Sequence, residues 1–345
     1  MTSKNLQVIE LKIEKKDRST LVVDFHNHFY PKAYIDELRR EKGYAAVSKD
    51  DHGRLLIHYT GDYNVVVGGH IDLSERLRAM DKYGVDMQVL TLTTPGVERE
   101  APERGIKLAR MSNDEYAEIQ EKYPDRFTAL ATLPLQAPEE AARELERAVK
   151  DLGLKGAMLL SNVKGKPLDS PEFVKIFELA AKLDTVLYIH PTSPINDAYM
   201  DSYRLVPIMG FGVDTSLAVL RLVFSGVLKR LPQLKLVATH VGGVYPFLRG
   251  RIDRGFEAYP ECKVNISEPP SNYLKKVWMD SIIYDEDVLM SAIAFVTPEK
   301  LVLGSDYPHQ IGDLEHCVQR IRRLKLSDAD KEKILGGNAA KLLKL

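Results

Sequence analysis

Eight short apolar runs recur along this chain of 345 residues, and segments with helical spacing separate them. The runs lie at residues 21–28, 86–92, 127–133, 155–160, 185–190, 234–240, 276–282 and 300–306. Several are apolar without interruption, as in Leu187-Tyr188-Ile189, which is expected of parallel strands buried on both faces. Between two of the runs, residues 138–152 place alanine, leucine and valine on one helical face. Strand and helix alternating eight times predict a (β/α)8 barrel of the α/β class.

The barrel is expected to form a single domain over residues 21–345, preceded by a polar arm at residues 1–20. Two segments depart from a minimal barrel, at residues 31–72 after the first strand and at residues 191–213 after the fifth. Both follow the C-terminal ends of strands, where barrel enzymes build their active sites and lids. We therefore expect the insertion 31–72 to lie near an active-site mouth. A helical tail is predicted from Leu326, with Ser327 as its N-cap.

The composition excludes several classes of protein. The hydrophobic content of 44% is enough for a large core, and the net charge of −1 gives no reason to expect nucleic acid or an anionic membrane as a partner. No window of about 18 uninterrupted apolar residues is present to span a bilayer. The two cysteines, Cys262 and Cys317, form no spacing motif. A reducing, cytoplasmic location is the simplest expectation.

Two histidines separated by one residue end the first strand. Side chains at positions i and i+2 of a strand leave the same face, so His26 and His28 can direct both imidazoles at one point. The fifth predicted strand ends at His190, the sixth at His240 and the eighth at Asp306. Because the C-terminal ends of barrel strands meet at one mouth, these five side chains are expected to converge.

Each of these residues also has an ordinary structural explanation. The first-strand histidines would suit a polar strand end, His190 a buried turn, His240 a helix entry and Asp306 a turn before Tyr307-Pro308. All of these separate explanations would have to apply to residues that meet at one mouth of the barrel. A single convergent site is therefore the better interpretation. His309 follows Asp306 by three residues and is a candidate for lining the mouth. By contrast, His52, His58 and His70 fall in the first insertion and are expected to be solvated.

The residues favour one metal ion rather than two. Two-metal hydrolases with this fold need a bridging lysine near the end of strand four, whereas here that strand ends Met158-Leu159-Leu160-Ser161 and Lys155 lies at its opposite end. We predict a single divalent ion on His26, His28, His190 and Asp306, leaving His240 free for proton transfer. Three imidazoles and one carboxylate favour Zn²⁺, and Mn²⁺ is the alternative if the substrate chelates through oxygen. No phosphate-binding glycine motif or organic cofactor is expected.

With these residues identified, the chain resembles the amidohydrolase-related metal-dependent decarboxylases. The pattern is that of α-amino-β-carboxymuconate-ε-semialdehyde decarboxylase and its resorcylate and carboxyvanillate relatives. The resemblance runs from about Val22 to the C-terminus. Its motifs are Asp24-Phe25-His26-Asn27-His28, Leu133-Pro134-Leu135-Gln136-Ala137-Pro138, His190-Pro191, His240-Val241-Gly242-Gly243-Val244-Tyr245-Pro246-Phe247 and Leu303-Gly304-Ser305-Asp306-Tyr307-Pro308.

The resemblance implies metal binding by the first-strand and fifth-strand histidines and the eighth-strand aspartate, with proton handling by His240. It also implies a homodimer in which Arg251 reaches the site of the neighbouring subunit. Asn64 stands where the semialdehyde decarboxylases carry an arginine for a substrate carboxylate, so a phenolic acid or another unsaturated carboxylate is as much expected as the same substrate. Asn64, Arg251 and His309 are the candidate substrate-binding residues.

The expected activity is decarboxylation of an unsaturated or aromatic (hydroxy)carboxylic acid, a small-molecule substrate. Carbon dioxide cannot leave an sp² carbon without an electron sink, and protonation of that carbon, managed by His240 or Asp306, would provide one. A hydrolase is the alternative, in which the same site activates water to cleave a lactone or an amide. A metal-binding protein without catalysis is disfavoured, because every expected site residue is present.

Overall fold

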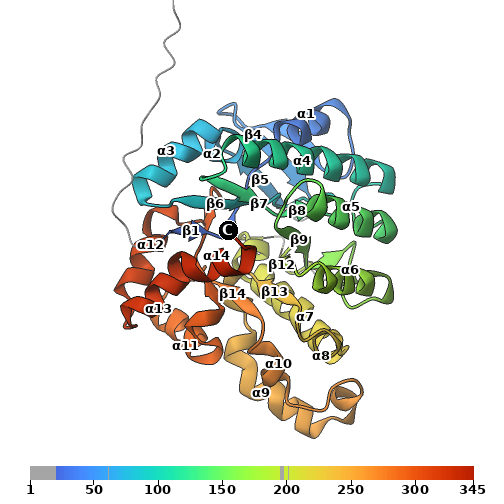
Figure 1. Cartoon of the computed structure of the whole chain (residues 1–345). Helices are drawn as coiled ribbons and strands as arrows, with labels where there is room; N and C mark the ends of the chain where they lie inside the picture. Colours follow the sequence, from blue (N-terminus) through green and yellow to red (C-terminus); the bar gives the residue numbers. More distant parts are fainter. Residues whose placement is uncertain (1–20, 61, 195–197, 201) are drawn as a thin grey trace, which may run out of the picture.

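The fold is described from a computed structural model, which covers residues 21–60, 62–194, 198–200 and 202–345. The arm predicted at residues 1–20 lies outside the described residues. The remaining chain forms a closed barrel surrounded by helices (Figure 1), which confirms the predicted fold class.

Eight parallel strand positions make the barrel, and each overlaps one of the predicted runs. In chain order they are β1 Val23–Asp24 with β2 His26–Asn27, β6 Met87–Leu90, β7 Phe127–Ala129 with β8 Ala131–Thr132, β9 Gly156–Leu160, β12 Val186–His190, β13 Lys235–Ala238, β14 Trp278–Asp280, and β15 Leu301–Val302 with β16 Gly304–Tyr307. Every neighbouring pair is parallel. The ring closes where β16 pairs with β2, placing Gly304 opposite His26.

One long helix follows each strand position and covers the outside of the barrel. These helices are α3 Leu73–Tyr83, α4 Pro102–Lys122, α5 Pro138–Lys150, α6 Pro171–Lys182, α7 Phe211–Phe224, α9 Tyr245–Ala258, α11 Glu286–Val296 and α12 Leu314–Arg323. Shorter elements connect them: α8 Val227–Arg230, α10 Pro270–Leu274, η2 His240–Gly242, η3 Pro260–Lys263, η4 Pro298–Lys300 and the hairpin β10 Asn162–Val163 with β11 Lys166–Pro167.

Local sequence explains several helix boundaries. Proline at the first turn of α4, α5 and α6 has no N–H that would be left without a partner. Asp72 accepts the backbone N–H groups of Ser74 and Glu75 at the start of α3, and that helix ends at Gly84 with φ 78°. Only glycine adopts this left-handed conformation without steric cost, so the chain turns there into the second strand.

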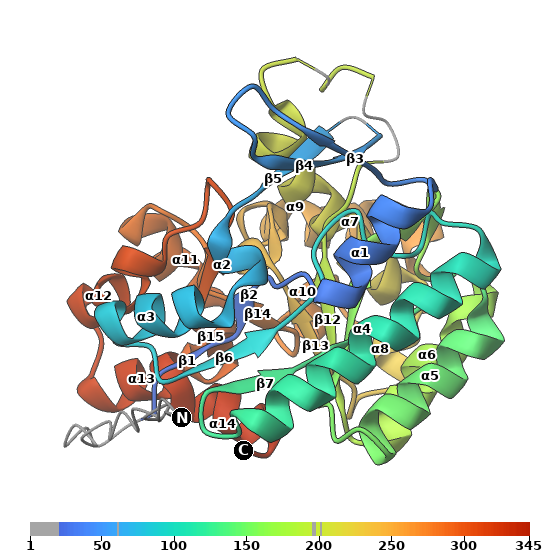
Figure 2. The same cartoon turned by 90° about the horizontal axis from the view of Figure 1, so that it is seen from above.

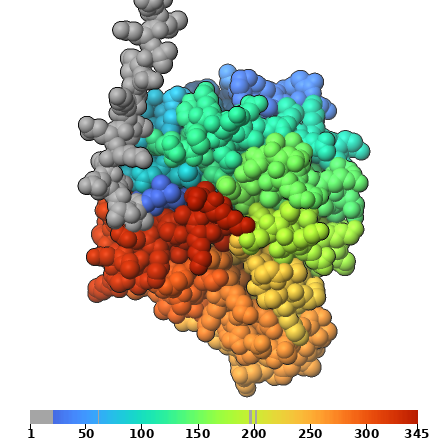
Figure 3. Space-filling view, viewed as in Figure 1, coloured from blue at the N-terminus to red at the C-terminus, as the bar shows by residue number. Residues whose placement is uncertain are grey.

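The C-terminal tail closes one end of the barrel. It contains α13 Asp328–Glu332, η5 Lys333–Gly337 and α14 Asn338–Leu343, and the Ser327 hydroxyl caps α13 as predicted. Ala339, Leu342 and Leu343 of α14 join the apolar cluster inside the barrel, with Val23 and Phe25 among its other members. Figure 1 looks onto this end, where α14 lies across the strands, and the same red surface covers the centre of Figure 3.

The first insertion folds into a small unit at the opposite end. It contains α1 Lys32–Arg40, the antiparallel sheet β3 Ala46–Lys49, β4 Leu55–Tyr59 and β5 Asp62–Val66, and α2 Gly68–Ile71. Figure 2 shows this sheet above the barrel, on the side away from both termini. The sheet itself was not predicted. Its position over the mouth agrees with the expectation for residues 31–72.

The second insertion leads into a long, apolar helix. The turn η1 Val206–Gly210 runs directly into α7, and residues 206–224 are long and apolar enough to cross a membrane by length and composition alone. Half of this stretch is buried inside the protein. Its buried half includes Val219, Leu222 and Val223, which belong to the main core, so packing against the barrel accounts for much of its apolar character.

Candidate metal centre and active site

The strand ends bring His26, His28 and Asp306 into direct contact. The Nε2 atoms of the two histidines lie 3.1 Å apart, and Asp306 Oδ1 lies 3.3 Å from His26 Nε2 and 3.2 Å from His28 Nε2. His190 packs its ring against both histidines, with ring centroids 5.3 Å and 4.8 Å away. The four residues predicted as metal ligands are therefore together, and all four are buried.

The hydrogen bonds on the far side of each ring fix which nitrogen faces the centre. His190 Nδ1 donates to the carbonyl of Pro191 at 2.8 Å, and His26 Nδ1 lies 2.6 Å from a carboxylate oxygen of Asp280. The Thr91 hydroxyl donates its hydrogen to the carbonyl of Asn27, so His28 Nδ1 must be the donor in its 3.0 Å contact with Thr91 Oγ1. In the neutral rings the proton is thus on Nδ1, and all three Nε2 atoms present a lone pair inward.

The electrostatics of the centre favour binding of a cation. Burial alone would lower the pKa of His26, but the carboxylates of Asp280 and Asp306 raise it to about 10. Burial lowers the pKa of His28 and of His190 well below the usual value, so these rings stay neutral. Asp306 is buried, which would raise its pKa, yet the charge on His26 holds that pKa well below the ordinary range. Without an ion, the proton on His26 supplies the positive charge that the buried Asp306 carboxylate needs, and a divalent cation held by the three Nε2 lone pairs and Asp306 would take the place of that proton.

The donor set fits one divalent ion. Bonds of about 2.1 Å place neighbouring ligand atoms about 3.0 Å apart in octahedral and about 3.4 Å apart in tetrahedral coordination. The observed separations of 3.1–3.3 Å among His26, His28 and Asp306 fall within this span. At the end of β9, where two-metal enzymes carry a lysine, Ser161 donates instead to Asp214.

His240 lies at the edge of the centre. Its Nε2 is 3.9 Å from Asp306 Oδ2 and near enough to His26 and His190 for the four groups to share an ion. It is also the most accessible of the group, with 20% of its side chain exposed, and its Nδ1 has no hydrogen-bond partner among the described residues. The backbone is left-handed at His240 (φ 54°) and at Val241 (φ 49°), a conformation that non-glycine residues adopt at some cost.

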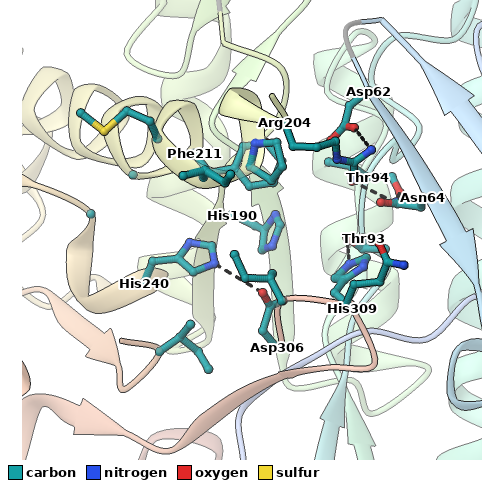
Figure 4. Close-up of a pocket in the computed structure, with 18 of the residues that line it drawn as sticks. Asp62, Asn64, Thr93, Thr94, His190, Arg204, Phe211, His240, Asp306 and His309 are labelled. Atoms are coloured by element: carbon teal, nitrogen blue, oxygen red, sulfur yellow. Dashed lines mark hydrogen bonds and ion pairs between the residues drawn. The ribbon is translucent and has the colours of Figure 1, made fainter. Parts of the chain in front are cut away.

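A cavity of about 700 Å³ opens onto this centre. Figure 4 shows His190, His240 and Asp306 at its base, with Phe211 above them. Asn64 and His309 line the cavity as predicted for substrate-binding residues, and His309 hydrogen-bonds Thr93 Oγ1 through Nε2 at 3.0 Å.

Arg251 is absent from the cavity wall. It lies on α9 with its side chain exposed. Its two obvious acidic neighbours have other partners: Asp253 accepts the backbone N–H of Ser271, and Glu257 pairs with Arg254. An ordinary ion pair therefore does not account for Arg251, and its predicted role across a subunit interface stays a prediction.

Several site residues were missed from the sequence. Asp280, which orients His26, ends β14 in the structure but lies two residues before the end of the predicted run 276–282, so the strand-end criterion applied to that run did not mark it. Arg204 lines the cavity from the second insertion, where no motif marks it. The expectation that His70 is solvated was wrong: it is fully buried, stacks on Tyr30 and packs against His309.

Comparison with known proteins places this geometry in a family. Residues 23–345 match the family described as amidohydrolase, Amidohydro_2. The chain belongs to this family. It is 35% identical over 335 residues to the 2-amino-3-carboxymuconate-6-semialdehyde decarboxylase of Dictyostelium discoideum, covering 94% of this chain and 92% of that protein.

Solved structures give the same result. The 5-carboxyvanillate decarboxylase of Sphingomonas paucimobilis superposes with a TM-score of 0.84 and 28% identity, over 95% of this chain and all of that one. A dihydroxybenzoic acid decarboxylase of Polaromonas sp., solved with manganese and the inhibitor 2-nitroresorcinol, superposes with a TM-score of 0.78 and 27% identity, covering 94% of this chain and 97% of that one. The predicted resemblance is confirmed, and these relatives are carboxy-lyases.

Proposed function

We propose that this protein is a metal-dependent decarboxylase of an aromatic or unsaturated (hydroxy)carboxylic acid and uses no organic cofactor. The observation that carries the proposal is the inward convergence of three Nε2 lone pairs and Asp306 at the base of a cavity that also holds His240. The named activities of the relatives support this class of reaction.

His26, His28, His190 and Asp306 would hold the ion, which supplies Lewis-acid polarisation of the substrate oxygens. His240 and Asp306 are the groups placed to move a proton. A proton delivered to the carboxyl-bearing carbon forms a C–H bond with a π electron pair of the double-bond system, so that carbon then carries four single bonds. The carbon–carbon bond to the carboxylate then breaks, its electron pair restores the double-bond system, and carbon dioxide leaves. The apolar groups around the cavity limit access of water to the reacting carbon.

One argument favours zinc as the bound ion and another favours manganese. Three imidazoles and a carboxylate favour zinc, which is our proposal for the resident ion. The manganese in the Polaromonas relative supports the alternative, because a substrate that binds through two oxygens suits a harder ion. Metal analysis of the purified protein, followed by reconstitution with each ion, distinguishes the two.

A homodimer is proposed as the active form. Three elements carry exposed apolar side chains, namely Ile208 and Met209 of η1, Leu217 of α7, and Phe247 and Leu248 of α9. Of these, Ile208, Met209 and Phe247 also line the cavity. In Figure 3 the orange segment from α9 to α10 projects from the body of the protein, which would allow Arg251 to reach a second subunit. We also propose a cytoplasmic location, supported by the free cysteines Cys262 and Cys317.

The test of the proposed function is release of carbon dioxide from hydroxybenzoates and unsaturated diacids by the metal-loaded protein. We expect activity to disappear on chelation and return with one equivalent of divalent ion per chain. The double variant His26→Ala plus His28→Ala should lose both metal and activity, whereas His316→Ala, on the exposed side of α12, should lose neither. Hydrolysis of lactones or amides without carbon dioxide release would favour the hydrolase instead. Two ions per chain would contradict the single-metal site.

A further inference from the structure

The cavity has two walls of different chemistry. One wall carries polar side chains from β5 and from the loop after β6, including Asp62, Asn64, Thr93 and Thr94. The facing groups are apolar and come from η1, α7, α9 and the loop after β14: Pro207, Ile208, Met209, Phe211, Val244, Phe247, Ile282 and Ile283. Figure 4 shows this separation, with Asp62, Asn64, Thr93 and Thr94 on one side and Phe211 with His240 on the other. Above His190, His240 and Asp306 at the base, polar side chains are therefore concentrated on the wall formed by β5 and the loop after β6.

Asn64 is held in one orientation within the polar wall. Its Nδ2 lies 2.7 Å from the carbonyl oxygen of Thr94, which can only accept, so the nitrogen and not the oxygen must face that group. The same nitrogen is 2.8 Å from the hydroxyl of Tyr30, whose hydrogen is already donated to the Thr94 carbonyl. Asn64 Oδ1 has no hydrogen-bond partner among the described residues and belongs to a side chain that lines the cavity. It offers a fixed acceptor.

The positive charge near this wall is already neutralised. Arg204 is the one lysine or arginine among the described residues that line the cavity. Its guanidinium lies 2.6 Å from Asp62 Oδ1, donates to the Tyr63 carbonyl and stacks over the Tyr63 ring at 4.5 Å. The Asp62 side chain is almost fully buried, so this ion pair is shielded from solvent on one side. A carboxylate placed beside Asn64 would meet acceptor oxygens without a free cation to balance it.

We propose that Asn64 selects substrates that carry a neutral hydrogen-bond donor, such as a hydroxyl, on the ring edge facing β5, and that a second carboxylate at that position is rejected. This inference rests on the proposed function and narrows its substrate class to monocarboxylic acids. The metal-bound carboxylate is the single negative charge, and Asn64 Oδ1 accepts the hydrogen of the hydroxyl. The opposite ring edge lies on the apolar wall, where methyl or methoxy groups are accommodated.

Binding of salicylates to the metal-loaded protein, measured by isothermal titration calorimetry, tests this assignment. The probes carry one further hydroxyl, methyl or carboxylate group at ring position 4, 5 or 6. At one of these positions the hydroxyl compound should bind about tenfold more tightly than the methyl compound, the difference expected for one added hydrogen bond. The carboxylate compound should bind most weakly at that position.

Two variants connect the preference to named residues. Asn64→Leu should remove the tenfold advantage of the hydroxyl compound and leave the affinity for the methyl compound unchanged. Asp62→Asn keeps the shape of the side chain but frees Arg204, so the carboxylate compound should gain about tenfold in affinity. Asp169→Asn is the matched control, because it frees Arg221 from a similar ion pair outside the cavity and should change nothing.

The outcomes separate this inference from the proposed function. Tightest binding of the carboxylate compound to the wild type would overturn the inference, as would a hydroxyl preference that survives in Asn64→Leu. If Asn64→Leu does not fold, the wild-type order and Asp62→Asn still decide. Hydroxyl preference without carbon dioxide release would support the inference and contradict decarboxylation. Carbon dioxide release with a preference for the carboxylate compound would support decarboxylation and contradict the inference about Asn64. Absence of binding by every probe would overturn both.

Discussion

At the scale of single residues, the histidines around Asp306 differ in whether their Nδ1 atoms have a hydrogen-bond partner, and this difference supports their proposed roles as metal ligands or as a proton-transfer group. His26, His28 and His190 each have an Nδ1 partner that fixes the ring, which is how metal-binding imidazoles are usually held. His240 has no such partner among the described residues and is more accessible. A ring that must gain and lose a proton needs this freedom, whereas a ligand does not.

Replacing His240 tests that distinction. His240→Ala should keep close to one metal ion per chain while kcat falls by about 10²–10⁴-fold, the usual contribution of general acid–base catalysis. Metal content by mass spectrometry and rates of carbon dioxide release measure the two effects on the same sample. His58→Ala, on the insertion sheet, serves as a control with normal values for both. Loss of metal from His240→Ala would place this histidine among the ligands.

At the scale of elements, the strands were predictable and the insertions were not. Strand runs such as residues 185–190 are apolar on both faces, because each barrel strand is covered by helices outside and by side chains inside. The sheet β3–β4–β5 gives a weaker pattern, since one of its faces is solvated and its strands carry Ser48, His58 and Tyr63. The polar wall of the cavity depends on this sheet, so Asn64 could be named as a candidate but its hydrogen bonds could not be anticipated. Asp62 and Arg204 are 142 residues apart in sequence and meet only in the folded protein.

The buried carboxylate of Glu98, in the loop after β6, makes the free energy of unfolding depend on pH. Glu98 follows β6, is fully buried and accepts backbone N–H groups that include the one of Val97 at 2.8 Å. Burial raises its pKa from 4.5 to about 7. The folded protein therefore holds this proton more tightly than the unfolded chain. The contribution of Glu98 to the free energy of unfolding falls as pH rises from about 4.5 to about 7 and does not change above that range.

Glu98→Gln should remove this dependence. Relative to the wild type, the variant should gain about 2.5 kcal/mol in unfolding free energy between pH 5 and pH 8, from a pKa difference of about 2.5 units. Urea unfolding of both proteins at the two pH values measures the difference, and the other ionisable groups cancel in the comparison. Glu103→Gln, at the exposed start of α4, is the control. A constant gap between wild type and Glu98→Gln at both pH values would show that Glu98 is ionised in the folded protein.

At the scale of the whole molecule, the site is open on the side where apolar residues are exposed. Phe247 lies at the cavity mouth and is also one of the exposed residues proposed to contact a second subunit. A partner on this face would narrow the entrance and bring its α9 near the cavity. Arg251 was named from the family pattern and not from any local signal, because a sequence carries little information about which surface a second copy covers.

Subunit mixing tests the arginine across the interface. Arg251→Ala and His240→Ala chains should each be nearly inactive alone, whereas mixed dimers should regain activity at the one site that has both residues intact. At equal mixing, half of the dimers are mixed, so about one quarter of the wild-type activity is expected, as one intact site in each mixed dimer. Arg254→Ala, one turn further along α9, should remain active by itself. A monomer in solution, or no recovery after exchange confirmed with labelled chains, would rule out action in trans.

The way the barrel closes also determines when the metal-ligand side chains can come together during synthesis. β2 lies within the first strand position, yet its partner β16 is made almost 280 residues later, and α14, which covers the barrel floor, is made later still. His26 and His28 therefore meet Asp306 only after the eighth strand has been made. A ribosome that stalls before the last strand leaves two histidines on an open strand edge, exposed to pairing with other chains. The complete set of proposed metal ligands thus forms only in chains whose eighth strand has been made and has closed the barrel.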